Sequence, residues 1–353
     1  MNDIREMMMN TAEKVFRDRC TKDLLHDAEK GLWPQGLWDI VEELGFTSLG
    51  VEEESGGTGG TLGDAFCVLH LAGKYGVPLP LAETLLGNWL LSKSGMFIEA
   101  GPLAIAPINR NDSFHFQKNE EGWLVTGEAQ NIPFGRHSKK LIVIGTSEQG
   151  VLIAKIDSSQ CHFQEGLGIS CEPRDNVYMN KIQVSSWDAV PLPGKIHPES
   201  LYMCGALTRV ALMAGSMERI LEMSVNYSME RVQFGKPIAH FQAIQQQLAV
   251  LAGEVEAAKT ASIYAYESEN SEFMEKDIMM AKIRVSQAVG IVTSIAHQIH
   301  GAMGITDEYP LHYFTRRLWS WREEFGNESQ WANQLGQYVL DKGADSFWSA
   351  VLS

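Results

Sequence analysis

The stretch ERVQFGKPIAHFQAIQ, residues 230–245, joins two long helical patterns and decides which fold the chain is expected to adopt. We expect the first helix to end near Arg231, because Gly235 and Pro237 break helices, and a second helix to begin near Phe241. The break places the Arg231 guanidinium beside the free backbone N–H groups of the next helix start. A fork of donors next to a positive helix end is suited to a pyrophosphate.

Three further side chains of this stretch are suited to contact with a ring system. Phe234 offers a flat apolar surface. Gln233 and Gln242 can each donate and accept hydrogen bonds, as the edge of a flavin or an adenine requires. Taken by itself, however, the stretch is also an ordinary helix–loop–helix corner.

Apolar residues recur every three or four positions on both sides of this corner. They run from Leu207 to Val225, from Ile244 to Ala258 and from Met274 to Ile299. Long apolar stripes on consecutive helices are typical of a bundle, and we expect these residues to form its core. The pattern predicts a C-terminal helical bundle over residues 197–353.

The helical period is lost between residues 99 and 196, where short strand patterns replace it. These patterns lie at residues 114–117, 123–126, 141–144, 151–154 and 179–184. No helix of usual length separates them, which favours a small antiparallel β-domain over a parallel sheet. Residues 1–98 again show helical patterns. We therefore expect a mainly α chain with a central antiparallel β-domain, divided at 1–98, 99–196 and 197–353.

Composition narrows the classes of function. Of the 353 residues, 44 are acidic and 29 basic, and the net charge of −15 argues against a nucleic-acid binder. The five cysteines and ten histidines show no CxxC or HExxH spacing, so we expect no metal site and no disulfide framework. No apolar run approaches a membrane span, and Met1–Arg19 lacks the apolar core of a signal peptide, which predicts a cytoplasmic protein.

Two further stretches are rich in glycine. The run from Gly56 to Gly63 lacks both the GxGxxG and the GK[ST] spacing of nucleotide loops, and we expect a surface turn there. The stretch QIHGAMGITDEYP, residues 298–310, follows the longest helical pattern. Its Gly301 and Gly304 would end that helix and let a ligand or another backbone approach closely.

Together, residues 230–245 and 298–310 resemble the C-terminal domain of the FAD-dependent acyl-CoA dehydrogenase family. Residues 38–60, which end in a Glu-Glu-Ser-Gly-Gly run and further glycines, are similar to the family's N-terminal motif, so the resemblance covers most of the chain. It implies an N-terminal helical domain, a middle β-barrel or sandwich and a C-terminal four-helix bundle.

The resemblance also implies cofactor contacts. By position, residues that hold FAD in one subunit are matched by Arg231, Gln233, Phe234 and Gln242. The family loop that reaches the FAD adenosine of a neighbouring subunit is matched by Gln298, Gly301, Ala302 and Gly304. Because that loop acts on another subunit, the match implies an oligomer.

The family reaction is the α,β-dehydrogenation of an acyl-CoA thioester. A glutamate removes the α-proton while the β-hydrogen leaves as hydride to the flavin, and the electrons then pass to an electron-transfer flavoprotein. The resemblance thus implies an acyl-CoA substrate, FAD and an electron-transfer flavoprotein as partners.

The position of the base departs from the family pattern. Counting from Tyr309-Pro310 without gaps, Phe325 falls on the base position and Glu324 lies one residue early. One residue is about 100° of rotation on a helix, so the shifted carboxylate is not equivalent, although a loop could correct it. Glu324 is therefore the candidate base.

The alternative base site and the β-domain also depart from the family pattern. The site that some members use falls near Gly205, followed by Ala206 where the family has arginine, with Arg209 as a shifted substitute. The loop at residues 103–110 is short and lacks the family's Gly-Ser-Asp, and residues 131–137 resemble a variant of short members. Some short members are partner subunits of α2β2 acyl-CoA dehydrogenases, including enzymes for steroid side-chain thioesters.

The sequence is compatible with three functions. The first is a partner subunit that lacks its own base and pairs with a larger acyl-CoA dehydrogenase subunit. The second is a complete homo-oligomeric acyl-CoA dehydrogenase, and the third is a flavin oxidase or monooxygenase of the same fold. The cluster of Arg316, Arg317 and Arg322 is either a helix face paired with nearby acids or a pocket for anionic phosphates.

Overall fold

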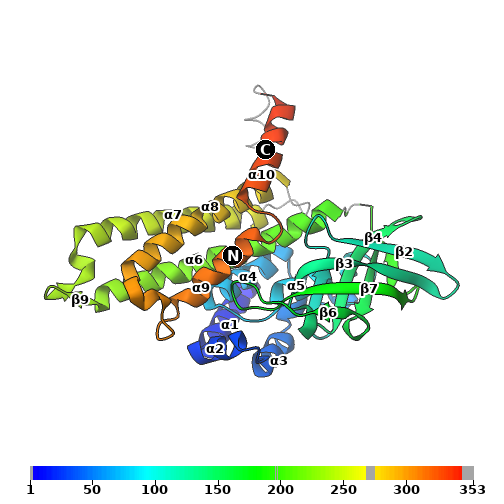
Figure 1. Cartoon of the computed structure of the whole chain (residues 1–353), viewed down its shortest axis with the longest axis horizontal. Helices are drawn as coiled ribbons and strands as arrows, with labels where there is room; N and C mark the ends of the chain where they lie inside the picture. Colours follow the sequence, from blue (N-terminus) through cyan, green and yellow to red (C-terminus); the bar gives the residue numbers. More distant parts are fainter. Residues whose placement is uncertain (1–2, 195, 197, 268–274, 344–353) are drawn as a thin grey trace.

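The computed structural model describes residues 3–194, 196, 198–267 and 275–343. A β-sheet lies at one end of an elongated molecule and a long helical bundle at the other, with the N-terminal helices packed against both (Figure 1). A mainly helical chain with a central sheet was expected, and this is confirmed. The first position of the longest apolar stripe, Met274, lies outside the described residues.

The N-terminal helices begin and end at capping residues, as α4 shows. Thr61 caps α4 through a reciprocal pair of hydrogen bonds with Asp64, and Gly76 ends it in the left-handed conformation at φ 64°. The glycine run before Thr61 forms the expected turn. The helices are α1 (Asp3–Arg19), α2 (Lys22–Glu29), α3 (Gln35–Glu43), α4 (Leu62–Tyr75) and α5 (Leu81–Lys93).

The sheet has eight strands in the order β6-β7-β3-β2-β4-β5-β8, with β1 beside β4. The strands are β1 (Leu103–Ala106), β2 (Ser113–Asn119), β3 (Gly122–Pro133), β4 (Lys140–Ser147), β5 (Gly150–Asp157), β6 (His162–Gln164), β7 (Arg174–Val184) and β8 (Ala189–Pro191). All five strand patterns of the sequence are found among them.

The sheet is mixed, which corrects the expectation of a purely antiparallel domain. The β2–β3 hairpin places β2 between β3 and β4, and β4 starts where β3 ends, so β4 runs parallel to β2. The first strand enters from α5 and pairs with β4 in parallel as well. Alternating patterns locate strands but do not say which neighbours they take, because pairing depends on the connections.

Three of the C-terminal helices, α6, α7 and α8, contain the apolar stripes of the sequence, and α9 and α10 follow them. The bounds are α6 (Pro198–Glu230), α7 (Gln242–Glu267), α8 (Glu275–His300), α9 (Leu311–Glu323) and α10 (Glu328–Lys342). A two-stranded hairpin, β9 (Val232–Gln233) and β10 (Lys236–Pro237), joins α6 to α7. The break at Gly235 and Pro237 is therefore confirmed.

The residues around α8 also meet the length and composition of a membrane span. Within the described residues, Glu275–Ile305 contains a window with a mean hydropathy of 1.3, which departs from the expectation of no such run. More than half of that window is buried inside the molecule. Its apolar residues pack against α6 and α7, as the central helix of a bundle requires.

Two glycines bring the N-terminal helices against the bundle. A Cβ on Gly73 of α4 would lie 2.0 Å from the carbonyl oxygen of Leu212, and one on Gly215 of α6 would lie 1.8 Å from that of His70. Both contacts are with backbone, so neither neighbour can move aside cheaply. The helices cross at this close distance only because neither glycine has a side chain.

We expect Gly215→Ala to lower the free energy of unfolding by about 2–3 kcal/mol, because the methyl group overlaps the His70 carbonyl. Gly253→Ala is the matched control, since Gly253 lies within α7 with nothing within 4 Å of its added Cβ. This control gains about 0.5–1 kcal/mol from helix propensity. Urea unfolding of both variants measures the contrast, and equal effects would refute the close crossing.

Candidate functional site

The two glycine-containing segments that the sequence singles out lie at the same end of the bundle. The helices α6 and α8 run in the same direction because α7 returns between them, so the hairpin after α6 and the turn after α8 are neighbours. The ring of Tyr227 stacks on His300 at 4.5 Å between centroids, and Tyr309 packs against both rings. This aromatic cluster joins the last turn of α6, just before residues 231–245, to residues 298–310 within one chain.

Most of the predicted cofactor residues at this end are exposed. In the part of the chain that the structure describes, the Arg231 side chain makes no hydrogen bond or ion pair. The Phe234 ring is 93% exposed at the tip of the hairpin, with a left-handed backbone at φ 52°. The other exposed members are Gln233, Gln242, Gln298, Gly301 and Ala302.

The two glycines of the second segment have different roles. Gly301 is exposed at φ 57°, and a Cβ there would meet nothing within 4 Å, so space is open beside it. Gly304 is buried, and its Cβ would lie 3.0–3.2 Å from the side chains of Leu311, His300 and His297. Packing alone therefore accounts for Gly304.

The candidate base, Glu324, has a side chain that is only 10% exposed and lies among cations where the end of α9 meets the sheet and α6. One carboxylate oxygen accepts hydrogen bonds from Arg174 Nε at 2.9 Å and Nη2 at 2.7 Å, and the other from Arg209 Nε at 2.6 Å. Burial raises the pKa of this carboxyl, but the two arginines outweigh it and hold the pKa at about 2. A carboxylate in this setting stays ionised and is occupied by structural partners.

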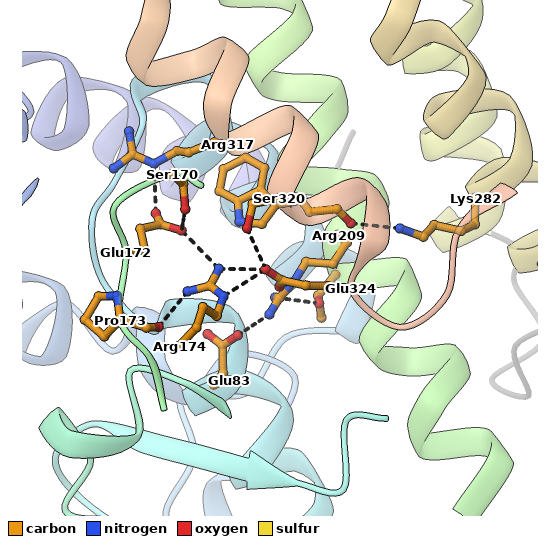
Figure 2. A network of polar contacts seen from close by, with 12 residues as sticks. Glu83, Ser170, Glu172, Pro173, Arg174, Arg209, Lys282, Arg317, Ser320 and Glu324 are labelled. Atoms are coloured by element: carbon orange, nitrogen blue, oxygen red, sulfur yellow. Dashed lines mark hydrogen bonds and ion pairs between the residues drawn. The ribbon is translucent and has the colours of Figure 1, made fainter. Parts of the chain in front are cut away.

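Glu324 belongs to a larger set of buried charges, which we call the buried charge network (Figure 2). Arg209 reaches Glu83 of α5, Arg174 Nη2 lies 3.1 Å from Glu172, and Arg317 of α9 donates to the same Glu172 at 2.8 Å. Three acids thus balance three arginines. The members are Glu83, Glu172, Arg174, Arg209, Arg317 and Glu324.

A lysine holds the helix end that carries Glu324. Lys282 of α8 is fully buried, and its Nζ donates to the carbonyl oxygens of Trp321 and Arg322 at 2.9 and 3.1 Å. These carbonyls belong to the last turn of α9, where a cation also meets the negative end of the helix dipole. Burial lowers the pKa of Lys282 to about 7.

The two positions that the family resemblance indicates for a base, Phe325 and Gly205, are in contact with each other. The Phe325 ring is 2% exposed and lies against α6, where a Cβ on Gly205 would come within 2.2–2.6 Å of the ring. The Arg209 guanidinium covers the ring at 5.2 Å from its centroid. The volume that a side chain at position 205 would need is therefore filled by a hydrocarbon ring, and neither position holds a carboxylate.

This contact was missed by sequence reasoning, which considered Phe325 and Gly205 separately. The two residues are 120 positions apart, and no local pattern links them. The only signal was their chemistry, since a large ring and a glycine are complementary in volume. Counting from each motif predicted that neither Phe325 nor Gly205 is a carboxylate. That the two residues touch depends on the packing of α9 on α6, which no motif contains.

The remaining sequence candidates are ion-paired or packed. Arg316 pairs with both oxygens of Glu29, and Arg322 pairs with Glu328. With Arg317 bound to Glu172, the arginine cluster is a set of structural ion pairs. In the β-domain, Arg136 binds Asp175, Glu165 and the carbonyl of Gly166, and Arg110 lies over the Tyr202 ring. No metal-binding cluster of three acids, histidines or cysteines occurs among the residues described.

Comparison with known proteins agrees with this geometry. The chain belongs to the acyl-CoA dehydrogenase family: the family's N-terminal domain matches residues 2–96 and its C-terminal domain matches residues 202–337. This is a family of FAD-dependent oxidoreductases that act on acyl-CoA.

Similar proteins include several acyl-CoA dehydrogenases. The acyl-CoA dehydrogenase IpdE2 of Mycolicibacterium smegmatis is 26% identical, over 90% of this chain and 93% of its own. The ChsE4-ChsE5 complex from Mycobacterium tuberculosis contains a chain with a TM-score of 0.88 at 18% identity, covering 98% of this chain and 99% of that one. A variant of the Tcur3481-Tcur3483 steroid acyl-CoA dehydrogenase has a TM-score of 0.84 at 20% identity. The match covers 96% of this chain and 98% of that one.

We expect Glu324→Gln to lower the free energy of unfolding at pH 7 by about 3 kcal/mol. The folded pKa of about 2 lies below the ordinary value of 4.5, so this stabilisation is complete above pH 4.5 and is lost as the pH falls toward 2. The difference between wild type and variant should therefore narrow on acidification. Urea unfolding at several pH values measures it.

The neighbouring Glu323 provides the control for this measurement, because its side chain is 60% exposed. Glu323→Gln should change stability little at any pH. A Glu324→Gln variant as stable as this control at pH 7 would contradict the assignment of Glu324 to the buried charge network.

Proposed function

We propose that this chain is the partner subunit of a heterotetrameric, FAD-dependent acyl-CoA dehydrogenase and has no base of its own. The observation that carries the proposal is the contact between Phe325 and Gly205, because it fills both family base positions without a carboxylate. The salt bridges of Glu324 support it further, since they leave that carboxylate no free oxygen for proton abstraction. Another, larger subunit then supplies the base.

The bundle end supports a role in holding FAD. The unpartnered guanidinium of Arg231 and the open space at Gly301 fit the phosphates and adenosine of a dinucleotide. In this proposal Arg231, Gln233, Phe234 and Gln242 contact one part of a shared FAD, and Gln298, Gly301 and Ala302 contact another across the subunit boundary. Bound FAD supplies the acceptor for the hydride that leaves the acyl β-carbon.

Exposed apolar side chains at the hairpin support an interface there. In the isolated chain, the exposed side chains there are Met229, Val232 and Phe234. Covering such residues with a second subunit removes apolar area from solvent, which favours association. The same subunit would bring the remaining contacts to FAD.

The substrate that we propose is a bulky acyl-CoA thioester, such as a steroid side-chain thioester. Support comes from the similar structure described as a steroid acyl-CoA dehydrogenase and from the similarity to the ChsE4-ChsE5 complex. The complex would work in the cytoplasm and pass its electrons to an electron-transfer flavoprotein.

The flavin-to-chain ratio tests the assignment. We expect almost no flavin on the chain purified alone, and one flavin for each pair of subunits after co-expression with a larger acyl-CoA dehydrogenase from the same genome. The physical reason is that the isolated bundle end offers only part of the contacts. Absorbance of released flavin against protein concentration measures the ratio. One flavin per chain without the partner, together with turnover of an acyl-CoA, would establish a complete homo-oligomeric enzyme instead.

A variant of this chain within the complex tests whether Arg231 contributes to flavin binding. Arg231→Ala should weaken flavin retention by tenfold or more, as expected for the loss of a charge-assisted hydrogen bond. The control is Arg17→Ala, since Arg17 is an exposed arginine of α1. Equal flavin content in both variants would remove Arg231 from the cofactor site.

A further inference from the structure

A cavity of about 320 Å³ lies where the connection between α1 and α2 meets α4, α6 and the start of α9. Three cations line it, and no acidic side chain does among the residues that the structure describes. We propose that this cavity binds a small phosphate monoester whose apolar ring packs against the uncharged part of the wall. The lining residues are Arg17, Lys22 and Arg219, with Cys20, Thr21, Leu25, Tyr75, Pro310 and Phe314.

The sign of the charge in this cavity is opposite to that of the chain. The whole chain has a net charge of −15. The groove between α1 and α3 and a cavity beside Trp33 both contain acidic as well as basic side chains. Three cations around one cavity repel one another, and a dianion held among them replaces that repulsion with attraction. The charge of the lining therefore selects an anion.

The three cations can be reached from solvent. The side chains of Arg17 and Arg219 are 59% and 36% exposed, and Lys22 is exposed as well. Arg17 contacts Asp18 through Nε, and Arg219 contacts Glu222 through Nη1, so each guanidinium has further donors for a phosphate oxygen. Among the described residues, Lys22 makes no hydrogen bond or ion pair.

The acids at the rim hold these cations weakly. The two rim pairs join exposed side chains, at 3.2 and 3.1 Å, and ion pairs of this kind contribute little free energy. Glu222 is in addition shared with Lys74 at 2.8 Å. The pKa of the exposed Glu308 is lowered chiefly by a hydrogen bond from Thr306 and least by Lys22. A dianion that reaches all three cations is therefore attracted more strongly than any rim acid.

The uncharged wall selects the rest of the ligand. The Thr21 hydroxyl oxygen accepts a hydrogen bond from the Leu24 N–H at 3.3 Å, which leaves its hydrogen to donate to a phosphate oxygen. The half-buried Tyr75 and Pro310 offer apolar surface, and the Tyr75 ring is fixed by a hydrogen bond from its hydroxyl to Glu13 at 3.0 Å. The volume is at the low end for small-molecule sites, which suits one ring with a phosphate and excludes a whole dinucleotide.

Calorimetric titration of the full chain tests the proposal with phenyl phosphate, inorganic phosphate and phenol, at about pH 8 where a phosphate monoester is a dianion. We expect phenyl phosphate to bind at least tenfold more tightly than phenol, because only the ester carries the anion. It should also bind at least threefold more tightly than inorganic phosphate, because only the ester carries the ring.

Three outcomes of this titration would count against the site. Absence of phenyl phosphate binding at millimolar concentration would overturn the proposal. Equal binding of phenol would remove the cations from the site. Inorganic phosphate bound as tightly as phenyl phosphate would contradict the role of the apolar wall.

Variants distinguish a built site from general attraction to basic residues. Lys22→Gln and Arg219→Gln should each weaken phenyl phosphate binding about fivefold to tenfold, through the loss of a charge-assisted hydrogen bond. The matched control is Arg19→Gln, since Arg19 is an exposed arginine two residues from Arg17 and does not line the cavity. It removes the same charge and should leave affinity unchanged. Equal losses in the control and in the other two variants would refute the site.

The proposal is independent of the shared FAD site, because none of the predicted cofactor residues lines this cavity. Arg17→Ala should weaken phenyl phosphate binding and keep the flavin-to-chain ratio of the complex, whereas Arg231→Ala should lower that ratio and keep phenyl phosphate binding. Loss of flavin in Lys22→Gln would place the cavity within the cofactor site and would contradict a separate phosphate site.

Discussion

The pairing of Glu324 with Arg174 and Arg209 is the interaction on which the arrangement of this molecule depends. It joins the end of α9 to the sheet and to α6, and Arg209 extends the connection to Glu83 of α5. Burying six charges gains little net stability, because desolvation offsets most of the attraction. Removing one member, however, leaves an uncompensated charge inside the protein. The network therefore acts mainly by penalising any other placement of these elements.

The same pairing has a chemical consequence. A carboxylate that abstracts a proton needs a free oxygen and a pKa near that of its task. The two arginines fix Glu324 as an anion with a pKa of about 2 and occupy both of its oxygens. Next to it, the Phe325 ring fills the space in front of Gly205. The region around the two positions that the resemblance indicates for a base is thus a packed and charged core in this chain.

Local patterns predicted five of the strands and the three longest helices but not how distant parts meet. The strand patterns at residues 114–117 and 123–126 and the helix break at Gly235 depend on neighbours within a few positions, and both were predicted correctly. The pairs that make the buried charge network are as far apart as Glu83 and Arg209 or Arg174 and Glu324. No periodicity records such pairs. For the same reason the sequence located Arg316 and Arg317 as a cluster but left open that their partners are Glu29 and Glu172.

The glycine contacts between α4 and α6 determine how the molecule can deform. With Gly73 against the backbone of Leu212 and Gly215 against that of His70, the two helices cannot slide past each other without collision of main-chain atoms. Shear along this crossing is blocked, so the N-terminal helices and the bundle travel as one rigid block.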